Sequence, residues 1–312
     1  MIIVRFTSGL GNQMFQYNLY SSLRERFPEV PVKADLSWFP RFGEHQGYEL
    51  ERIFGSNGFF SIEEATDREL IRCSGRIPNR LSGGIGEVWQ FILRIPHRLI
   101  RTFDRHERVR IDQTGFEDNA VIYKELESID PAKDHYITGF FIEEVYYRDR
   151  LDHLKKVFRF DDALSESAKG YRDMIESGVS VSIHVRRGDY LDAKYSDSFR
   201  SLGEEYYRAA VAKTRECFED PTFYLFSDDP DYIEKAFGWL DKKVIVRGNS
   251  GKDSYRDMQL MSLCNGNITA NSTFSLWAGL LNDHADKKVI YPSTYMKEKD
   301  FQVMTLPGWI RI

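Results

Sequence analysis

Short apolar runs alternate with mixed, helix-like segments at the start of this chain. The runs are rich in β-branched and aromatic residues, as buried strands are, and the mixed segments have the length of helices. The predicted elements of the first half are a strand over residues 2–6, a turn over Thr7–Gln13, a helix over Met14–Arg26 that ends before Pro28, a strand over Val30–Asp35 and a strand over His135–Ile142. Most of residues 40–135 shows no regular pattern. The order strand, turn, helix, strand predicts a parallel sheet.

The second half repeats this alternation more regularly. The predicted strands are Val179–Val185, Thr222–Phe226, Lys243–Val246, Asn267–Ala270 and Val289–Tyr291, and the predicted helices are Phe160–Asp173, Glu204–Phe218, Asp231–Phe237, Ser254–Cys264 and Thr273–Leu281. A length of 312 residues exceeds what one hydrophobic core usually serves. We therefore predict an α/β fold of two Rossmann-like domains that face each other across a cleft, with residues 1–165 in the first and 166–312 in the second.

The composition excludes several classes of protein. The chain is 42% hydrophobic, enough for packed cores, but no stretch is apolar over the length that spans a bilayer. The net charge of −5 argues against a nucleic-acid partner. Cys73, Cys217 and Cys264 are odd in number and widely spaced, which favours a reducing compartment and gives no disulfide or zinc signal. The first residues lack the features of a signal peptide, so we expect a cytoplasmic location.

One strongly basic stretch stands apart from this acidic background. Six arginines occur within residues 94–110, and apolar residues recur at helical spacing from Val88 onward, with Pro96 as a kink. One interpretation is peripheral contact of residues 88–110 with an anionic inner-membrane surface. The other is a solvated helix packed on the first domain.

The segment His184–Tyr190 carries the densest candidate chemistry. Arg186 and Arg187 follow a buried strand, where unpaired charges would be costly, and guanidinium groups fit phosphate oxygens. The carboxyl ends of strands are also where α/β sheets bind ligands. A phosphorylated ligand is the resulting prediction, with His184 beside it. The alternatives are a surface ion-pair turn with Asp189 and a buried structural histidine.

The segment Ala270–Ser275 joins a predicted strand to a predicted helix. Ser272, Thr273 and Phe274 would start that helix, whose free N–H groups and positive dipole end suit a diphosphate. The alternative is simple capping of the helix by Ser272 or Thr273.

Two acidic positions of the second half allow a functional interpretation. Asp257, on the preceding helix, offers the acceptor pair that the N1–H and N2 amine of guanine require, although a solvated helix acid is the ordinary alternative. Asp229-Pro230-Asp231 resembles a metal-chelating Asp-x-Asp. Because Pro230 favours the first position of a helix, we expect Asp229 to be an N-cap and no metal to bind.

Gly9-Leu10-Gly11-Asn12-Gln13 occupies the place of a dinucleotide-binding loop. Asp35 even ends the second strand, as the ribose-binding acid of a dehydrogenase does, but Met14 stands where the third glycine is required. This disfavours NAD. Gly11 still indicates close approach of the backbone to a ligand, and the alternative is an ordinary turn capped by Asn12.

Four segments in this order resemble the bacterial α-1,2-fucosyltransferases of glycosyltransferase family eleven. They are Gly9–Tyr17, His184–Tyr190, Phe226–Asp229 and Ala270–Trp277. The resemblance covers nearly the whole chain. It implies a GT-B-like fold with an acceptor-side first domain and a GDP-fucose-binding second domain. It further implies an inverting, metal-independent transfer from GDP-β-L-fucose to a hydroxyl, commonly O2 of a terminal galactose, without a cofactor.

The resemblance also assigns roles to residues. Arg186 would hold the diphosphate and stabilise the leaving GDP, and Asn12 would face the fucose or the acceptor. The expected donor-binding residues are His184, Arg186, Arg187, Asp257, Ser272, Thr273, Phe274 and Gly11, and the expected catalytic residues are Arg186, Asn12, Asp35 and Glu143. Asp35, Glu143 and Asp189 are the candidates for a general base, and none identifies itself from sequence.

Two departures from the family pattern leave the acceptor open. Leu276 replaces a second tryptophan, and Glu143-Glu144 replaces a segment that usually contains glutamine. The expected partner is a galactose-terminated oligosaccharide or a lipid-linked glycan. A fucosyltransferase of other linkage and a non-catalytic GDP-sugar-binding protein are the alternative functions.

Overall fold

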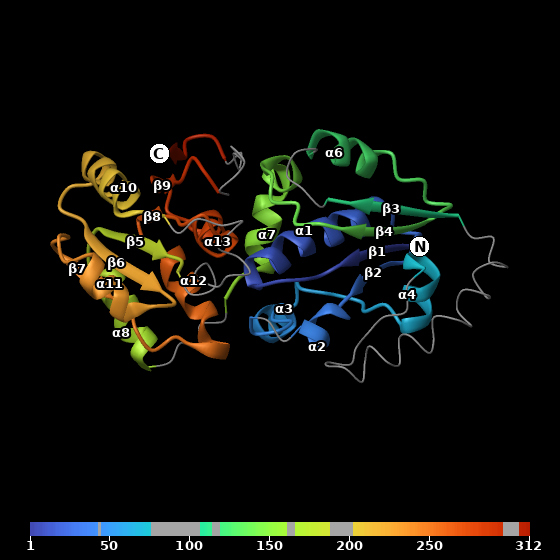
Figure 1. The fold of residues 1–312 in the computed structure, drawn as a ribbon, viewed down its shortest axis with the longest axis horizontal. Coiled ribbons are helices and arrows are strands. Elements are labelled where there is room, and N and C mark those ends of the chain that lie inside the picture. The colour runs from blue at the N-terminus through green and yellow to red at the C-terminus, as the bar shows by residue number, and fades with distance from the viewer. Residues whose placement is uncertain (43–44, 76–106, 114–118, 161–165, 188–201, 296–305) are drawn as a thin grey trace. The chain divides into compact units, whose positions relative to one another are not determined.

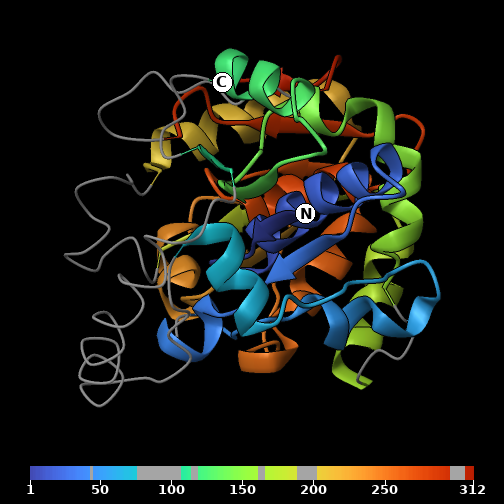
Figure 2. The same ribbon diagram turned by 90° about the vertical axis from the view of Figure 1, so that its right-hand side faces the viewer.

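The computed structural model describes residues 1–312 except 43–44, 76–106, 114–118, 161–165, 188–201 and 296–305. The described residues form two compact units, Met1–Asp149 and Arg150–Ile312 (Figure 1), and Figure 2 shows the same ribbon from the side. Each unit holds its own parallel sheet, as the predicted α/β fold requires. The units divide after Asp149, whereas the predicted domains divide after residue 165.

Unit 1 is built around a sheet of four strands in the order β2-β1-β4-β3. Its described elements are β1 (Ile2–Arg5), α1 (Leu10–Arg26), β2 (Val32–Asp35), α2 (Trp38–Phe42), α3 (Leu50–Phe54), η1 (Gly55–Asn57), α4 (Asp67–Ser74), β3 (Arg108–Asp112), α6 (Asn119–Glu127), β4 (Asp134–Thr138) and η3 (Glu144–Tyr146), with η4 (Arg148–Arg150) at the boundary. Residues 2–4 of β1 are all buried, which explains their apolar sequence, because both faces of a parallel sheet are covered.

Helix α1 is buried on nearly all sides rather than along one stripe. Its buried polar side chains therefore need partners inside the unit. Asn18 Nδ2 donates to the Tyr146 carbonyl at 2.7 Å, and Gln13 and Gln16 bond to the loops described below. These bonds fix α1 against segments that are distant in sequence.

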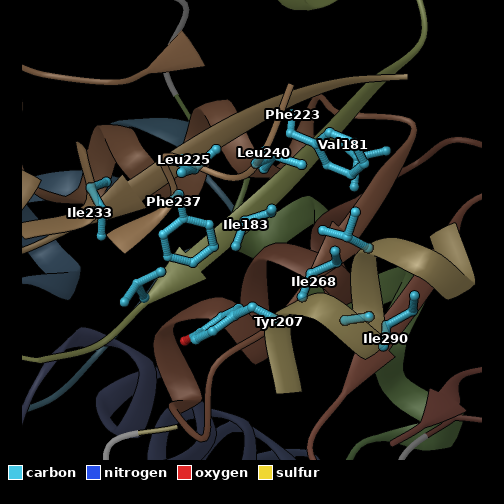
Figure 3. Close-up of a cluster of buried hydrophobic side chains, with 13 residues drawn as sticks. Val181, Ile183, Tyr207, Phe223, Leu225, Ile233, Phe237, Leu240, Ile268 and Ile290 are labelled. Atoms are coloured by element: carbon cyan, nitrogen blue, oxygen red, sulfur yellow. The ribbon is translucent and has the colours of Figure 1, made fainter. Parts of the chain in front are cut away.

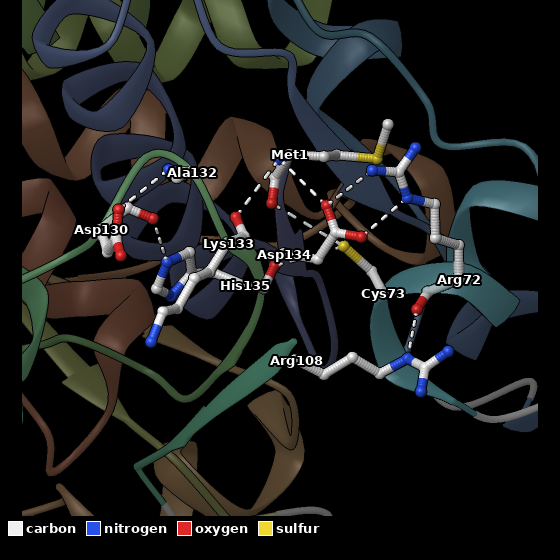
Figure 4. Close-up of polar contacts among 9 residues, drawn as sticks. All are labelled: Met1, Arg72, Cys73, Arg108, Asp130, Ala132, Lys133, Asp134 and His135. Atoms are coloured by element: carbon white, nitrogen blue, oxygen red, sulfur yellow. Dashed lines mark hydrogen bonds and ion pairs between the residues drawn. The ribbon is translucent and has the colours of Figure 1, made fainter. Parts of the chain in front are cut away.

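At the amino edge of this sheet, charges neutralise one another (Figure 4). Asp134 accepts from Arg72 Nε at 2.7 Å and from the Met1 ammonium at 3.2 Å. Burial acts to raise the pKa of Asp134, but the bonds from Arg72 and the ammonium outweigh it and lower that pKa. Burial raises the pKa of the neighbouring Cys73 thiol to about 12, which leaves it an unreactive core group.

Unit 2 is built around a sheet of six strands in the order β10-β9-β8-β5-β6-β7. Its described elements are α7 (Leu151–Val157), α8 (Glu166–Glu176), β5 (Ser180–Val185), α10 (Glu204–Cys217), β6 (Thr222–Ser227), α11 (Pro230–Ala236), β7 (Lys243–Ile245), η6 (Gly251–Asp253), α12 (Tyr255–Ser262), β8 (Gly266–Ile268), α13 (Thr273–Leu281), β9 (Lys288–Tyr291) and β10 (Ile310–Arg311). The predicted strands and helices of this half are present with ends shifted by a few residues, except that the helix predicted from Phe160 is described only from Glu166.

The apolar core of unit 2 lies between the sheet and helices α10 and α11 (Figure 3). Ile183 and Leu225 of neighbouring strands are fully buried there, together with Ile233 of α11. Tyr207 of α10 joins the same cluster, and Figure 3 shows its hydroxyl at the margin. This packing holds α10 against the central strands.

The opposite face of the same strands is polar and buried. Asn267 Nδ2 donates to Ser182 Oγ at 2.8 Å and to the Met261 carbonyl at 2.7 Å, and Asn282 Nδ2 donates to Asn267 Oδ1 at 2.8 Å. Since Met261 belongs to α12 and Asn282 ends α13, this network attaches both helices to β5 and β8. Such fully satisfied networks specify one arrangement of the packed elements.

Three predicted elements need correction. Helix α1 begins at Leu10, not Met14, because Gly9 has the extended conformation of an N-cap. The strand predicted over His135–Ile142 ends at Thr138, where Gly139 and Phe141 take positive φ angles. The helical interpretation of the basic stretch is wrong for Arg108 and Arg110, which lie in β3 beside β4. Residues 88–106 lie outside the described part of the chain.

Candidate functional site

The sheet of unit 2 reverses its strand order between β5 and β8. From β5 the chain proceeds to β6 and β7 on one side, and then to β8, β9 and β10 on the other. In open α/β sheets, ligands bind at the carboxyl ends of the strands that flank such a reversal. The residues that follow β5 and β8 therefore define a candidate site.

Two segments singled out from the sequence occupy these two positions. Arg186 and Arg187 follow β5, and the Ser272–Phe274 corner follows β8. Ile183 pairs with Ile268 in the parallel ladder, and the rings of His184 and Phe274 lie 5.6 Å apart. The fold thus brings these motifs together at one edge of one sheet.

The Ser272–Phe274 corner is the amino end of α13. Ser272 is the N-cap, and its Oγ accepts from the Phe274 N–H at 3.4 Å. The capping alternative is therefore confirmed, but one cap satisfies only one of the free N–H groups of a helix start. The first turn of α13 holds no acidic residue, so its positive dipole end remains suited to an anion.

The two arginines are held differently. Arg186 Nη1 lies 3.1 Å from Asp228 Oδ2, with its side chain 26% exposed. Arg187 directs its guanidinium to α11, where its Nε lies 3.3 Å from Asp229 Oδ2 and its centre 3.6 Å over the Tyr232 ring. Arg187 is thus engaged by protein groups on both counts.

Asp229 is the N-cap of α11, as predicted. Its Oδ1 accepts from the Tyr232 N–H at 3.1 Å, and Pro230 occupies the start of the helix. Asp189, the other partner expected for the arginines, lies outside the described residues.

His184 and Thr269 are buried and lie directly after the last residues that pair β5 with β8. In the continued register they face each other on the polar side of the sheet, and their side chains are 5% and 0% exposed. Within the described residues, His184 Nδ1 and Thr269 Oγ1 have no hydrogen-bond partner. Burial and then the Arg186 charge lower the pKa of His184 to about 3, so its imidazole is neutral at pH 7. Unpaired buried polar atoms point to a ligand group or a bound water.

Asp257 lies in the first turn of α12 and is half-buried. Its Oδ1 accepts from Asn249 Nδ2 at 2.8 Å. Burial raises the pKa of Asp257 to about 7, although the Asn249 bond acts to lower it. A carboxyl group with this pKa is poised to become an acceptor when a donor group approaches it.

In unit 1 the strand order reverses between β1 and β4, and the glycine-rich segment follows β1. Gly9 is the N-cap of α1, while Gly11 and Asn12 lie in its first turn, Gly11 buried and Asn12 half-buried. An added Cβ on Gly9 would lie 3.4 Å from His45 Nδ1, so the exposed His45 ring rests against this turn. Sequence reasoning missed His45, which no motif marks.

Two glutamines of α1 hold the loops at this edge. Gln13 Nε2 donates to the carbonyls of Ser8 and Gly47, each at 2.8 Å, and its Oε1 accepts from the Glu49 N–H at 3.0 Å. Gln16 Nε2 donates to the Gly139 carbonyl at 2.9 Å. These amides attach the turn after β1 to the turn after β4.

Positive φ angles also occur in these loops. Positive φ angles occur at Ser8, His45 and Phe141, none of them glycine, and at Gly47 and Gly139. Such conformations cost free energy and cluster at ligand-binding sites, so they support a functional edge in unit 1 as well.

The described candidates for a general base are both buried. Asp35 Oδ2 accepts from the Tyr136 hydroxyl at 2.5 Å and its Oδ1 from the Ser37 N–H at 2.9 Å. Glu143 precedes η3 and is 7% exposed. Glu49, which sequence reasoning missed, is buried beside Gln13, and burial raises its pKa to about 7 although Arg52 lowers it. The geometry gives no preference among these carboxyl groups.

Two curated proteins match this chain over nearly its whole length. The chain is 26% identical over 320 residues to "Alpha-1,2-colitosyltransferase" of Escherichia coli, covering 100% of this chain and 99% of that protein. It is 25% identical to "O-antigen biosynthesis glycosyltransferase WbnK" of Escherichia coli, over 98% of each chain. A mouse relative, "Galactoside 2-alpha-L-fucosyltransferase Sec1", is 24% identical over 78% of this chain and 66% of its own.

Among solved structures, the fold is similar to that of fucosyltransferase NodZ from Bradyrhizobium. The TM-score is 0.53 at 14% identity, over 90% of this chain and 91% of that chain. A structure of NodZ alpha-1,6-fucosyltransferase soaked with GDP-fucose has a TM-score of 0.51 at 15% identity, with the same coverage. These likenesses confirm the predicted GT-B-like α/β class.

The family comparison agrees with the edge built from β5 and β8. The matching description is "Glycosyl transferase family 11", and the match spans residues 110–312. It includes the arginine pair after β5 and the amino end of α13. By this match over most of its length, the chain belongs to glycosyl transferase family 11.

Proposed function

We propose that this protein transfers L-fucose from GDP-β-L-fucose to a hydroxyl of a glycan, and that this hydroxyl is O2 of a terminal galactose. The observation that carries the proposal is that Arg186 and the amino end of α13 follow two paired strands at one sheet edge, where the strand order reverses. A permanent cation and free N–H groups at one edge suit a pyrophosphate. Family membership and relatives named as α-1,2-transferases support the sugar and the linkage.

The proposed reaction inverts the anomeric centre. The acceptor oxygen bonds to C1 of fucose, the bond from C1 to the diphosphate oxygen breaks, and the acceptor proton passes to a base. Negative charge grows on the departing GDP, so Arg186 and the α13 N–H groups would stabilise the transition state more than the ground state. Asp35, Glu143 and Glu49 remain the candidate bases within the described residues.

Donor recognition would involve the remaining residues of the unit 2 edge. Asp257 would accept from the guanine N1–H and N2 amine, and the neutral His184 would bond to the nucleotide through its free Nδ1. Thr273 and Phe274 would contribute backbone N–H groups of α13. Gly11 and Asn12 of unit 1 would approach the fucose or the acceptor. The proposed reaction needs no metal.

The deciding experiment combines GDP-fucose with lactose, N-acetyllactosamine and Galβ1,3GalNAc in turn. NMR of the product would identify the linkage, and the expected product is Fucα1,2Gal. An α-1,3 or α-1,6 linkage would replace the proposed specificity by another. GDP binding without transfer to any acceptor would favour the non-catalytic alternative.

Colitose is a second candidate sugar, because a relative matching over the full length carries that name. Equimolar competition between GDP-fucose and GDP-colitose separates the two. A preference of more than about tenfold for one donor corresponds to about 1.4 kcal/mol and would assign it.

Location remains a separate proposal. No helix among the described residues is long and apolar enough to cross a membrane. We propose a cytoplasmic enzyme whose residues 88–110 contact the inner membrane peripherally, where a lipid-linked glycan would be available. The test is flotation of the protein with liposomes that contain or lack anionic lipid. Flotation that does not depend on anionic lipid would exclude the proposed membrane contact.

A further inference from the structure

The parallel ladder between β5 and β8 stops one bond short of the candidate site. Pairing ends at Ile183 and Ile268. If the ladder continued in this register, the Ala270 N–H would donate to the His184 carbonyl. Instead, the Ala270 N–H donates to Ser275 Oγ at 3.1 Å, and the His184 carbonyl accepts from the Tyr207 hydroxyl at 3.2 Å. Two side-chain hydroxyls thus take the place of one bond between strands.

The adjacent tyrosine makes the equivalent contact on the other strand. Tyr206 donates its hydroxyl to the Thr269 carbonyl at 2.6 Å. Tyr206 and Tyr207 are consecutive residues of α10, and their rings meet edge to face at 5.1 Å. One helix therefore holds the carboxyl ends of both strands that flank the reversal of strand order.

These hydroxyls remove the cost of separating the strands. A buried carbonyl or N–H group without a partner is strongly unfavourable, so strands of a sheet normally pair as far as they run together. With Tyr207 and Ser275 as substitutes, β5 and β8 can diverge after Ile183 without leaving either backbone group unsatisfied. His184 Nδ1 and Thr269 Oγ1, both buried and without a partner among the described residues, lie just where the strands diverge.

We propose that Tyr206, Tyr207 and Ser275 are positioning residues that hold β5 and β8 apart so that the diphosphate of the donor can enter between Arg186 and the amino end of α13. This inference rests on the proposed function for the identity of the ligand. The arrangement of the hydroxyls is independent of it. None of the three side chains needs to touch the donor for the role to hold.

The test is a double-mutant cycle of Tyr207→Phe and Ser275→Ala in the full chain. Each single substitution leaves one backbone group without its hydroxyl partner, so urea denaturation should give an unfolding equilibrium shifted about tenfold toward the unfolded state. In the double variant, the Ala270 N–H and the His184 carbonyl can pair with each other. The double variant should then be at least as stable as either single variant. If the two losses were additive, its unfolding equilibrium would instead shift about a hundredfold toward the unfolded state.

GDP affinity, measured by calorimetry, should not recover in the double variant, although stability does. Each single substitution should weaken GDP binding about tenfold, and the double variant about a hundredfold, because closing the ladder narrows the binding edge. A residue that only supports the fold would not lose affinity while stability recovers. Tyr206→Phe should weaken GDP binding about tenfold by releasing the turn that leads into α13.

Thr214→Val is the matched control. It removes a buried hydroxyl from the same helix, which donates to the Ala210 carbonyl at 2.8 Å and makes no contact with β5 or β8 through that bond. GDP affinity should stay within about twofold. Additive stability losses in the double variant, or unchanged GDP affinity in all variants, would overturn the inference. If the unsubstituted protein binds no GDP, the proposed function is contradicted, and the stability cycle alone still decides whether the hydroxyls hold the strands apart.

Discussion

The carboxyl edges of the two sheets carry different kinds of polar group. In unit 2, Arg186 follows β5 at the sheet edge where α13 begins, and it lies two residues after the neutral, buried His184. In unit 1, the corresponding edge is held by the amides of Gln13 and Gln16 and by left-handed backbone. One edge, which we call the positive edge, carries guanidinium groups and helix N–H groups. The other, which we call the neutral edge, is held by amide side chains.

This difference matches the two substrates of the proposed reaction. A nucleoside diphosphate is an anion and needs cations and N–H groups, whereas a neutral sugar is bound mainly through hydrogen bonds to amides, hydroxyls and backbone. The same α/β unit can serve either purpose because its ligand groups lie on the loops and not in the sheet. Substitutions at one edge should therefore leave binding at the other largely unchanged.

The largest effect is expected when the positive edge loses its central cation. Arg186→Ala should lower kcat/KM by about 10²–10³-fold, because it removes a group that stabilises the departing diphosphate. Arg187→Ala is the matched control and should lower it less than about fivefold, since that guanidinium is already engaged by Asp229 and Tyr232. Steady-state kinetics with varied GDP-fucose measure both. An equal loss of kcat/KM in the two variants would show that Arg187 contacts the donor in spite of its ion pair with Asp229.

A smaller effect is expected from disturbing the neutral edge. An added Cβ on Gly139 would lie 2.6 Å from Gln113 Cβ, and Gln113 Oε1 accepts from the N–H groups of Phe140 and Phe141. Gly139→Ala should therefore cost about 2–4 kcal/mol of stability and raise the KM for the acceptor. GDP affinity should not change.

Gly9→Ala provides the contrast within unit 1. Its added Cβ would meet only the His45 ring at 3.4 Å, an ordinary contact, so stability should change by less than about 1 kcal/mol. Thermal unfolding and acceptor titration measure both variants. A loss of GDP affinity in Gly139→Ala as large as the loss of acceptor affinity would contradict the division of roles between the edges.

The finest test uses the pH dependence of donor binding. The pKa of Asp257 is about 7 in the free protein, and guanine would bind the carboxylate form. GDP binding should therefore weaken as pH falls below 7, approaching tenfold per pH unit from this group, and should level off above pH 8. Calorimetry of Asp257→Asn against the unsubstituted protein removes the contribution of the GDP phosphates, which titrate in both. Identical pH slopes would exclude Asp257 from the nucleotide site.

For the free protein the sign of the same linkage is opposite. Since the folded-state pKa of Asp257 lies above its ordinary value of 3.8, the folded state retains a proton that the unfolded chain has lost between these values. This group therefore contributes stability at low pH that is lost as pH rises toward 7. A donor that binds the carboxylate would offset that loss.

Local sequence pattern predicted unit 2 well and unit 1 poorly. The strands and helices of unit 2 follow short apolar runs and a capped helix start, as at Ser272 and Pro230, so local preferences and the fold agree. In unit 1, Arg108 and Arg110 were expected in a helix but lie in β3, because pairing with β4 overrides the spacing of the arginines. The start of α1 was placed too late because Gly9 and Gly11 resemble a loop, whereas Gly9 alone is the cap.

The sequence by itself determined the α/β class, the family and which motifs carry charge, because these depend on residue type and local spacing. It could not determine which groups share an edge or which of them remain unpaired. Strand order placed Arg186 and the start of α13 at the same sheet edge, burial gave Asp257 and His184 their shifted pKa values, and α10 placed Tyr207 against the His184 carbonyl. Those properties depend on distances between residues far apart in the chain, and only tertiary packing sets such distances.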